Sequence, residues 1–160
     1  MNSTRQAKPA RARANAVKGR HNTMAIYFPN DLESGSGCYI MSSMMSPNLI
    51  KFGETTDLYQ RWGKAKQRFA RCAGFDGAKG AKEKGWNLKT AVKVEDWIPM
   101  PESTQDEREA FEDKIREALE SAGAVPFIRI EENNNNRSEH YLIPVDLMAI
   151  EVDGILIHLR

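Results

Sequence analysis

The sequence predicts an α+β fold, an α/β sandwich in which a small, mostly antiparallel β-sheet is flanked by helices and followed by a C-terminal β-hairpin. Three observations support this prediction. Two alternating apolar segments separated by a turn lie between residues 37 and 53. Two later segments, around Trp62 and around Ile115, have apolar residues at helical spacing. Further strand-like segments lie between and after them, and this order is typical of helices packed on a sheet.

Length and composition indicate one soluble globular domain. The chain has 160 residues, of which 41% are hydrophobic and 28% charged, so it can bury one core. Its apolar runs are too short for a membrane span or a secretory leader. We therefore expect a cytoplasmic protein with no membrane partner.

The cysteines and histidines do not predict a structural zinc site. Cys38 and Cys72 form no CxxC pair, and His21, His140 and His158 are far apart in sequence. In a chain without a signal peptide, the two cysteines are expected to be free thiols.

The formal net charge is only +1, but the charges are segregated along the chain. Residues 1–34 have a composition that cannot build a core, so we predict a disordered basic arm there and a folded domain over residues 35–160. Residues 63–86 form a second basic stretch. Basic segments on one surface are typical of phosphate binding, so we expect nucleic acid as a partner. The predicted DNA-binding residues are Arg5, Lys8, Arg11, Arg13, Lys18, Arg20, Lys64, Lys66, Arg68 and Arg71.

The first folded element is expected to be a hairpin. In "CYIMSS", Tyr39 alternates with its neighbours as in a half-buried strand, and in "LIKFG", Lys51 points opposite to Ile50 and Phe52. Pro47 and the adjacent asparagine predict the reversal between them.

A helix should follow, with a cap from Thr55 or Thr56 and with Asp57 in its first turn. Its buried stripe is predicted to be Leu58, Trp62, Ala65 and Phe69, with Arg61 at the edge of that stripe. A Gly- and Lys-rich loop then leads to a third strand within residues 87–98.

The second helix is expected to be capped by Ser103 or Thr104 and to end at Gly123. Its predicted apolar stripe is Phe111, Ile115, Ala118, Leu119 and Ala122. Glu112 and Glu107 lie at opposite borders of this stripe, so either carboxylate could face a cleft, and helical geometry does not choose between them.

Residues 125–130 are predicted to be a fourth strand, followed by an Asn-rich loop. The dipeptide Asp153-Gly154 between alternating residues predicts the closing hairpin.

Residues 37–61 resemble the GIY-YIG nuclease superfamily. Residues 37–39, "GCY", resemble its first motif with Cys in the middle, and residues 51–53, "KFG", resemble its second. Arg61 follows eight residues after this second motif, as in the family's pattern.

The resemblance extends over roughly residues 37–142 and is closest to the phage-type branch, in which Lys occupies the tyrosine position of the second motif. The family's metal-binding Glu lies in a later helix in an E-x-x-I context, which "AFEDKIREAL" supplies at Glu112 and not at Glu107. In this branch a later Glu is followed by an aromatic residue, and "SEHYL" is similar, which adds Glu139 and His140 as candidate site residues.

The resemblance implies a DNA endonuclease that hydrolyses phosphodiester bonds. Tyr39 would be the general base, with its pKa lowered by the cations Lys51 and Arg61, which would also contact the phosphate. Glu112 would hold Mg²⁺ or Mn²⁺. One apparent site per chain implies a homodimer if both strands are to be cut.

Other interpretations stay open at the level of sequence. Each residue alone fits an ordinary role: a strand tyrosine, a surface arginine whose stem packs on apolar neighbours, a solvated helix carboxylate. The alternative function is a catalytically weak or inactive DNA-binding module of the same fold, and a third is a protein-interaction domain with an incidental basic tail.

Overall fold

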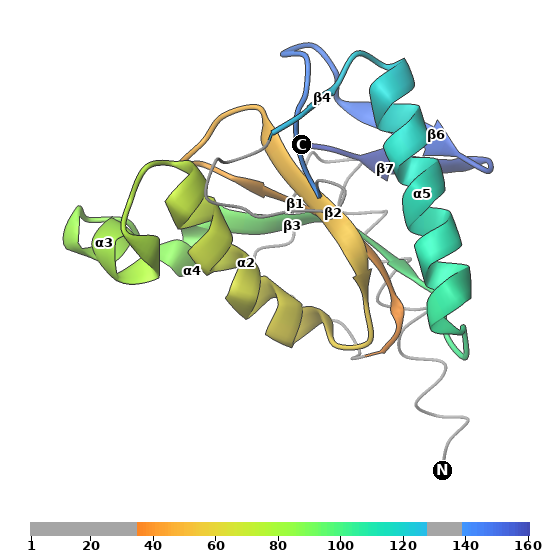
Figure 1. The fold of residues 1–160 in the computed structure, drawn as a ribbon, viewed down its shortest axis with the longest axis horizontal. Coiled ribbons are helices and arrows are strands. Elements are labelled where there is room, and N and C mark those ends of the chain that lie inside the picture. The colour runs from red at the N-terminus through yellow and green to blue at the C-terminus, as the bar shows by residue number, and fades with distance from the viewer. Residues whose placement is uncertain (1–34, 128–138) are drawn as a thin grey trace.

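The computed structural model describes residues 35–127 and 139–160, and its elements form an antiparallel sheet with helices on both faces (Figure 1). Five strands pair in the order β3-β1-β2-β5-β4, and β6 pairs with β7 in a separate hairpin. Every printed strand pair is antiparallel. The predicted α+β class and the C-terminal hairpin are therefore confirmed.

The centre of the sheet is the hairpin of β1 (Gly37–Ser43) and β2 (Leu49–Thr55). Their register pairs Tyr39 with Gly53 and Met41 with Lys51, so these four residues share one face of the sheet. The expected alternation is confirmed. The expected half-burial is wrong, because helices cover both faces and β1 is buried along almost its whole length.

Helix α2 (Leu58–Cys72) covers the face that carries Tyr39. Its predicted apolar stripe is buried as expected. The predicted cap is wrong: Asp57 is the N-cap and accepts a hydrogen bond from the Gln60 amide at 3.1 Å. Thr55 instead accepts a bond from the Asp57 amide through its hydroxyl and so fixes the turn before the helix.

The sequence predicted a loop for the Gly- and Lys-rich segment, and this prediction is wrong. The segment contains helix α3 (Gly77–Glu83). The short helix α4 (Leu88–Ala91) occupies the start of the predicted third strand, so β3 begins only afterwards (Val92–Pro99). Asn87 caps α4 and thereby turns the first part of the predicted strand into helix. Apolar contacts of Ala81 and Leu88 with α2 hold this unit on the domain.

Helix α5 (Gln105–Ser121) covers the opposite face of the sheet, on the other side from α2 (Figure 1). Thr104 and Glu107 form a capping box, which confirms one of the two predicted caps. Ile115 and Leu119 are buried on the sheet. Gly123, at φ 95°, follows the end of the helix, as its position predicted.

The remaining strands are β4 (Val125–Pro126), β5 (His140–Leu142), β6 (Ala149–Val152) and β7 (Ile155–His158). The predicted fourth strand is shorter than expected within the described residues, and its last residues, the Asn-rich loop and the N-terminal arm lie outside them. Asp153 and Gly154 both have positive φ and form the predicted turn of the hairpin. This hairpin packs beside α5 and completes the core on that face.

Two further expectations concern the cysteines and the membrane. Cys38 and Cys72 are free thiols. In residues 35–127 and 139–160, none of the helices has the length and apolar character needed to cross a membrane.

Candidate functional site

The candidate site lies at the edge of the sheet where β5 stops pairing with β2. The last paired residues of β2 and β5 are Lys51 and His140. One more hydrogen bond follows, from the Phe52 amide to the Glu139 carbonyl at 3.0 Å. Gly53 is the next residue. A Cβ atom placed on it would lie 2.7 Å from the Tyr39 hydroxyl oxygen and 3.0 Å from Glu139 Oε1. The absent side chain of Gly53 therefore leaves the space in which these two groups meet.

Tyr39 presents a buried hydroxyl at this point. Its side chain is fully buried, and within the described residues its hydroxyl has no hydrogen-bond partner of acceptable geometry. A buried polar group without a partner is unfavourable for stability and is typical of a functional position. Burial raises the pKa of the Tyr39 phenol above its ordinary value, while the charges of Lys51 and Arg61 oppose the rise.

This direction corrects one expectation. The sequence resemblance implies a phenol whose pKa is lowered by Lys51 and Arg61, and both residues do act in that direction. Burial has the larger effect because almost no water reaches the ring. Tyr39 is therefore a neutral phenol at pH 7 in the free protein.

Lys51 and Glu139 form the adjacent ion pair. Lys51 Nζ lies 2.9 Å from Glu139 Oε1, and the lysine is buried while the Glu139 side chain is 40% exposed. The same ammonium lies 5.6 Å from the centre of the Tyr39 ring. Desolvation lowers the pKa of Lys51, but the interactions with the Tyr39 oxygen and the Glu139 carboxylate together outweigh it and raise that pKa, so the positive charge is kept at the site.

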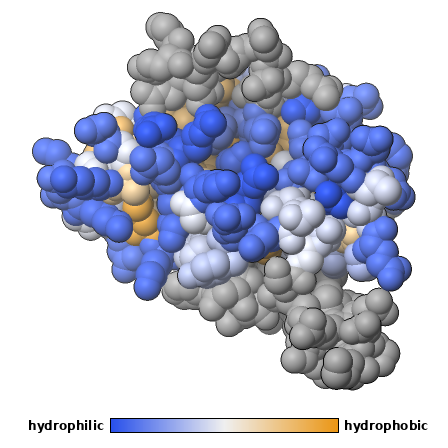
Figure 2. Space-filling view, turned by 60° about the horizontal axis from the view of Figure 1, so that its bottom comes forward, coloured by the Kyte–Doolittle hydropathy of each residue, from blue (hydrophilic) through white to orange (hydrophobic). Residues whose placement is uncertain are grey.

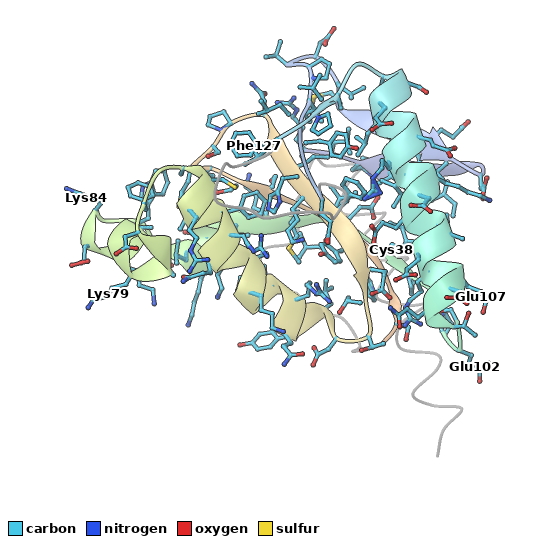
Figure 3. The ribbon with its side chains drawn as sticks, in the orientation of Figure 1. Cys38, Lys79, Lys84, Glu102, Glu107 and Phe127 are labelled. Carbon is cyan, nitrogen blue, oxygen red and sulfur yellow. The ribbon has the colours of Figure 1, made fainter. Side chains whose placement is uncertain are left out.

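Glu112 reaches the same edge from the opposite face of the sheet. Its carboxylate is half-buried on α5 and lies 3.3 Å from the guanidinium of Arg116, one turn later. Burial, then the charge of Glu139, raises the pKa of Glu112 to about 7, against the opposing charges of Arg116 and Lys51. The two carboxylates are thus close enough to repel each other. Glu107, the other sequence candidate, is fully committed to the capping box and lies on the outer side of α5 near its start (Figure 3).

Arg61 lines a polar pocket of about 210 Å³ beside this constellation. The pocket lies between the start of α2 and the first turn of α5 and also contains Lys64 and Arg108. Within the described residues the guanidinium of Arg61 has no hydrogen bond or ion pair. A free planar guanidinium next to a lysine matches the oxygens of a phosphate group.

His140 is buried and is not a base at neutral pH. Its ring packs edge-on against Phe69, with ring centres 5.7 Å apart. Burial and the charges of Lys51 and Arg68 lower the pKa of His140 to about 3. His140 is therefore a neutral, buried ring on β5, paired with Lys51 on β2.

Acid should unfold the protein partly through His140. An unfolded histidine binds a proton near pH 6.5, whereas the folded one does so only near 3. Its contribution to stability, on the order of 2–4 kcal/mol, is present above pH 6.5 and lost as the pH falls toward 3. We expect the melting temperature of His140→Gln to fall less between pH 7 and pH 4 than that of the wild type. Equal falls in both proteins would contradict the assignment.

The residues at the sheet edge fit a magnesium ion, although they form no dense ligand cage. Among the described residues there is no group of three or more His, Cys, Asp or Glu side chains that could bind a metal. Mg²⁺ is commonly held by one or two carboxylates, with waters and substrate phosphate as the other ligands. Burial first and the charge of Glu139 second raise the pKa of Glu112, and a cation bound there would offset both effects.

The predicted DNA-binding residues are described only in part. Lys64, Arg68 and Arg71 are exposed on α2, and Lys66 is half-buried. The six basic residues of the N-terminal arm lie outside the described residues. Figure 2 turns the lower side of the Figure 1 view forward, and the described part of that face is mainly hydrophilic.

Two buried arginines near the site were missed from the sequence. Arg108 is buried, and its Nε donates to Glu54 Oε1 at 2.8 Å, which ties α5 to the end of β2. Arg116 is also buried and faces the Phe52 ring at 5.0 Å. Arg108 and Arg116 flank Glu112 at i−4 and i+4, and this spacing is a signal that places all three on one face of the helix.

No match was found in comparisons with family models, curated proteins and solved structures. The chemistry of the site consequently follows from the residues that the fold brings together: a buried phenol, a buried ammonium, two neighbouring carboxylates and a free guanidinium.

Proposed function

We propose that this chain is a metal-dependent DNA endonuclease that hydrolyses phosphodiester bonds at the sheet edge around Gly53. The observation that carries the proposal is the convergence of the Tyr39 hydroxyl and the Glu139 carboxylate on the space left by Gly53. Lys51 forms an ion pair with Glu139 and lies beside the Tyr39 ring. The resemblance of residues 37–61 to GIY-YIG nucleases supports the same proposal.

Tyr39 is proposed to take the proton from the attacking water. Its hydroxyl is a buried, uncharged oxygen beside the Lys51 ammonium and the space left by Gly53, and it would accept the proton once substrate binding brings a water molecule to that space. Proton transfer to a group whose pKa is well above neutral is effective once the group is ionised. Lys51 and Arg61 favour that ionised state because both of their charges lower the pKa of the phenol.

Arg61 and Lys51 are proposed to bind the scissile phosphate and the charge that develops on its oxygens. Arg61 lines the open polar pocket and can donate two parallel hydrogen bonds. Lys51 is held in place by Glu139 and acts as a point charge. Preorganised cations at developing negative charge are typically the largest contribution of a protein to such a reaction.

Glu112 is proposed to hold Mg²⁺ or Mn²⁺, with Glu139 as the neighbouring carboxylate. When bound, such an ion stabilises the charge of the leaving oxygen. Glu112 must lose its proton for this purpose. Arg116 keeps the carboxylate oriented from one turn away.

The rate of DNA cleavage should depend on pH through these two residues. Glu112, whose pKa is about 7, must be ionised, and so must Tyr39, whose pKa lies above the ordinary value of a phenol. At Mg²⁺ concentrations well below saturation, where the metal does not displace the proton from Glu112, the logarithm of the rate is expected to rise with a slope of roughly two below pH 7 and roughly one above it, with no plateau below about pH 10. A plateau from pH 7.5 to 9.5 would exclude Tyr39 as the base.

A second candidate function is a DNA-binding module that does not cut. It is favoured by the ion pair between Lys51 and Glu139, in which each charge is already satisfied by the other. In such a module the cleft would bind phosphate through Arg61 and the basic surface of α2. Binding that is strongly salt-dependent, without cleavage in Mg²⁺ or Mn²⁺, would support it.

A further inference from the structure

A second pocket lies on the other side of α2, where helices α2, α3 and α4 meet, and its volume is about 600 Å³. Lys66, Lys82 and Lys89 line it, one from each helix. Trp86 and Leu88 provide apolar surface beside them. None of the residues that line this pocket belongs to the candidate cleavage site.

The walls of this pocket are tied together by Gln67. The side-chain oxygen of Gln67 on α2 accepts a hydrogen bond from the Ala78 amide on α3 at 2.6 Å. Gly77 packs against the same side chain, since a Cβ there would lie 2.7 Å from Gln67 Nε2. Gly77 also has a φ of 69°, which favours glycine. The pocket is therefore a feature of the fold and not a gap between loose loops.

The three lysines form a cluster of like charge. Lys66 Nζ lies 3.9 Å from the centre of the Trp62 ring, which holds the ammonium in place. Burial, then the charges of Lys82 and Lys89, lowers the pKa of Lys66. Three ammonium groups that repel one another around one opening attract an anion that can contact all of them.

Trp86 gives the pocket an aromatic surface that a simple anion would leave unused. The residue is half-buried and packs on the apolar cluster of Ala81 and Leu88, so its position is fixed by the fold. A half-buried tryptophan in a pocket offers an aromatic surface to a flat ring, and base stacking on such a surface is worth about 1–3 kcal/mol per base. Asn87, beside it in the pocket lining, carries an amide that can bond a base edge.

We propose that this pocket binds a nucleoside phosphate, with the phosphate among Lys66, Lys82 and Lys89 and the base against Trp86. The ligand is either a free mononucleotide or an unpaired nucleotide of a single strand, since both present the same base and phosphate. Binding here is independent of cleavage at Gly53.

The test is a titration of the full chain at low salt with dAMP, deoxyadenosine, inorganic phosphate and a single-stranded oligo(dA), followed by calorimetry and tryptophan fluorescence. We expect dAMP or the oligonucleotide to bind and to quench fluorescence, and Trp86→Phe to remove the quenching. The double variant Lys82→Gln/Lys89→Gln should bind roughly tenfold more weakly, because two charge-assisted contacts are lost. Binding of dAMP assigns a free nucleotide as the ligand, and binding of the oligonucleotide alone assigns a strand.

The matched control is Lys79→Gln/Lys84→Gln. These lysines project outward from the α3 segment (Figure 3) and do not line the pocket, but their replacement removes the same charge. The control should bind as the wild type does. The proposal is overturned by equal losses in the two double variants, by phosphate binding as tightly as dAMP, or by the absence of binding to both dAMP and the oligonucleotide.

Discussion

Tyr39→Phe is expected to reduce DNA cleavage by about 10²–10⁴-fold, the usual contribution of a general base. The substitution removes one oxygen and keeps the ring that fills the core beneath Gly53. That oxygen is buried and makes no hydrogen bond of acceptable geometry within the described residues, although the Lys51 ammonium interacts with it. Its loss should therefore change the free energy of unfolding by about 1 kcal/mol or less. A large loss of cleavage with nearly unchanged stability is specific to a catalytic hydroxyl.

The control for this variant is Tyr59→Phe. Tyr59 lies on α2 and is 55% exposed, so its hydroxyl is in water. Cleavage, measured as single-turnover conversion of a labelled duplex, should not change in this variant. If Tyr39→Phe cuts at the wild-type rate, Tyr39 is a core residue and the base lies elsewhere.

Glu112→Gln is expected to reduce Mg²⁺-dependent cleavage by about 10²–10³-fold, while DNA binding persists. The loss corresponds to several kcal/mol of charge stabilisation at the leaving oxygen. Binding should persist because Arg61 and the basic residues of α2 are untouched. Gel-shift and cleavage measurements on the same duplex separate the two effects.

The pKa of Glu112 also predicts the direction in which Glu112→Gln changes the free energy of unfolding. The pKa of Glu112 is raised to about 7 in the folded protein, so its contribution is full at low pH and is lost as the pH rises through 7. At pH 8 the neutral glutamine should therefore be at least as stable as the wild type, by up to about 1–2 kcal/mol after allowing for the partial exposure of the carboxylate. Reduced cleavage then cannot be attributed to unfolding.

Glu117→Gln provides the comparison on the same helix. Glu117 is exposed on α5. Its replacement by glutamine removes an equal charge without changing the sheet edge. The variant should cut DNA at the wild-type rate. If both variants lose activity equally, the effect is one of net charge and Glu112 has no special role.

Local patterns predicted most of the framework. The two strands around Tyr39 and Lys51, the stripe of α2 and the turn at Asp153 were all confirmed, because each depends on residues that are near one another in sequence. The error at α3 and α4 has a physical cause. The Gly and Lys residues of α3 are typical of loops, and that helix depends on tertiary contacts, such as the bond from the Ala78 amide to Gln67, that no local pattern contains. Helix α4 replaces the start of the predicted third strand, because Asn87 caps it.

The sequence named four residues of the candidate site, but it predicted neither the electrostatics of the site nor the buried Arg108 and Arg116. Spacing and resemblance named Tyr39, Lys51, Glu112 and Glu139, and the structure brings these four to one edge. The direction of the Tyr39 pKa could not be predicted, since it depends on helices covering both faces of β1. The ion pair of Arg108 with Glu54 also joins residues far apart in sequence.

The central claim is that this edge of the sheet cuts DNA, and the most direct measurement is nicking of supercoiled plasmid by the full chain in Mg²⁺, in Mn²⁺ and in excess chelator. We predict nicked circles with either metal and intact supercoils with the chelator. The contradicting result is supercoiled plasmid that stays intact in both metals at protein excess, under conditions where a gel shift shows that it is bound.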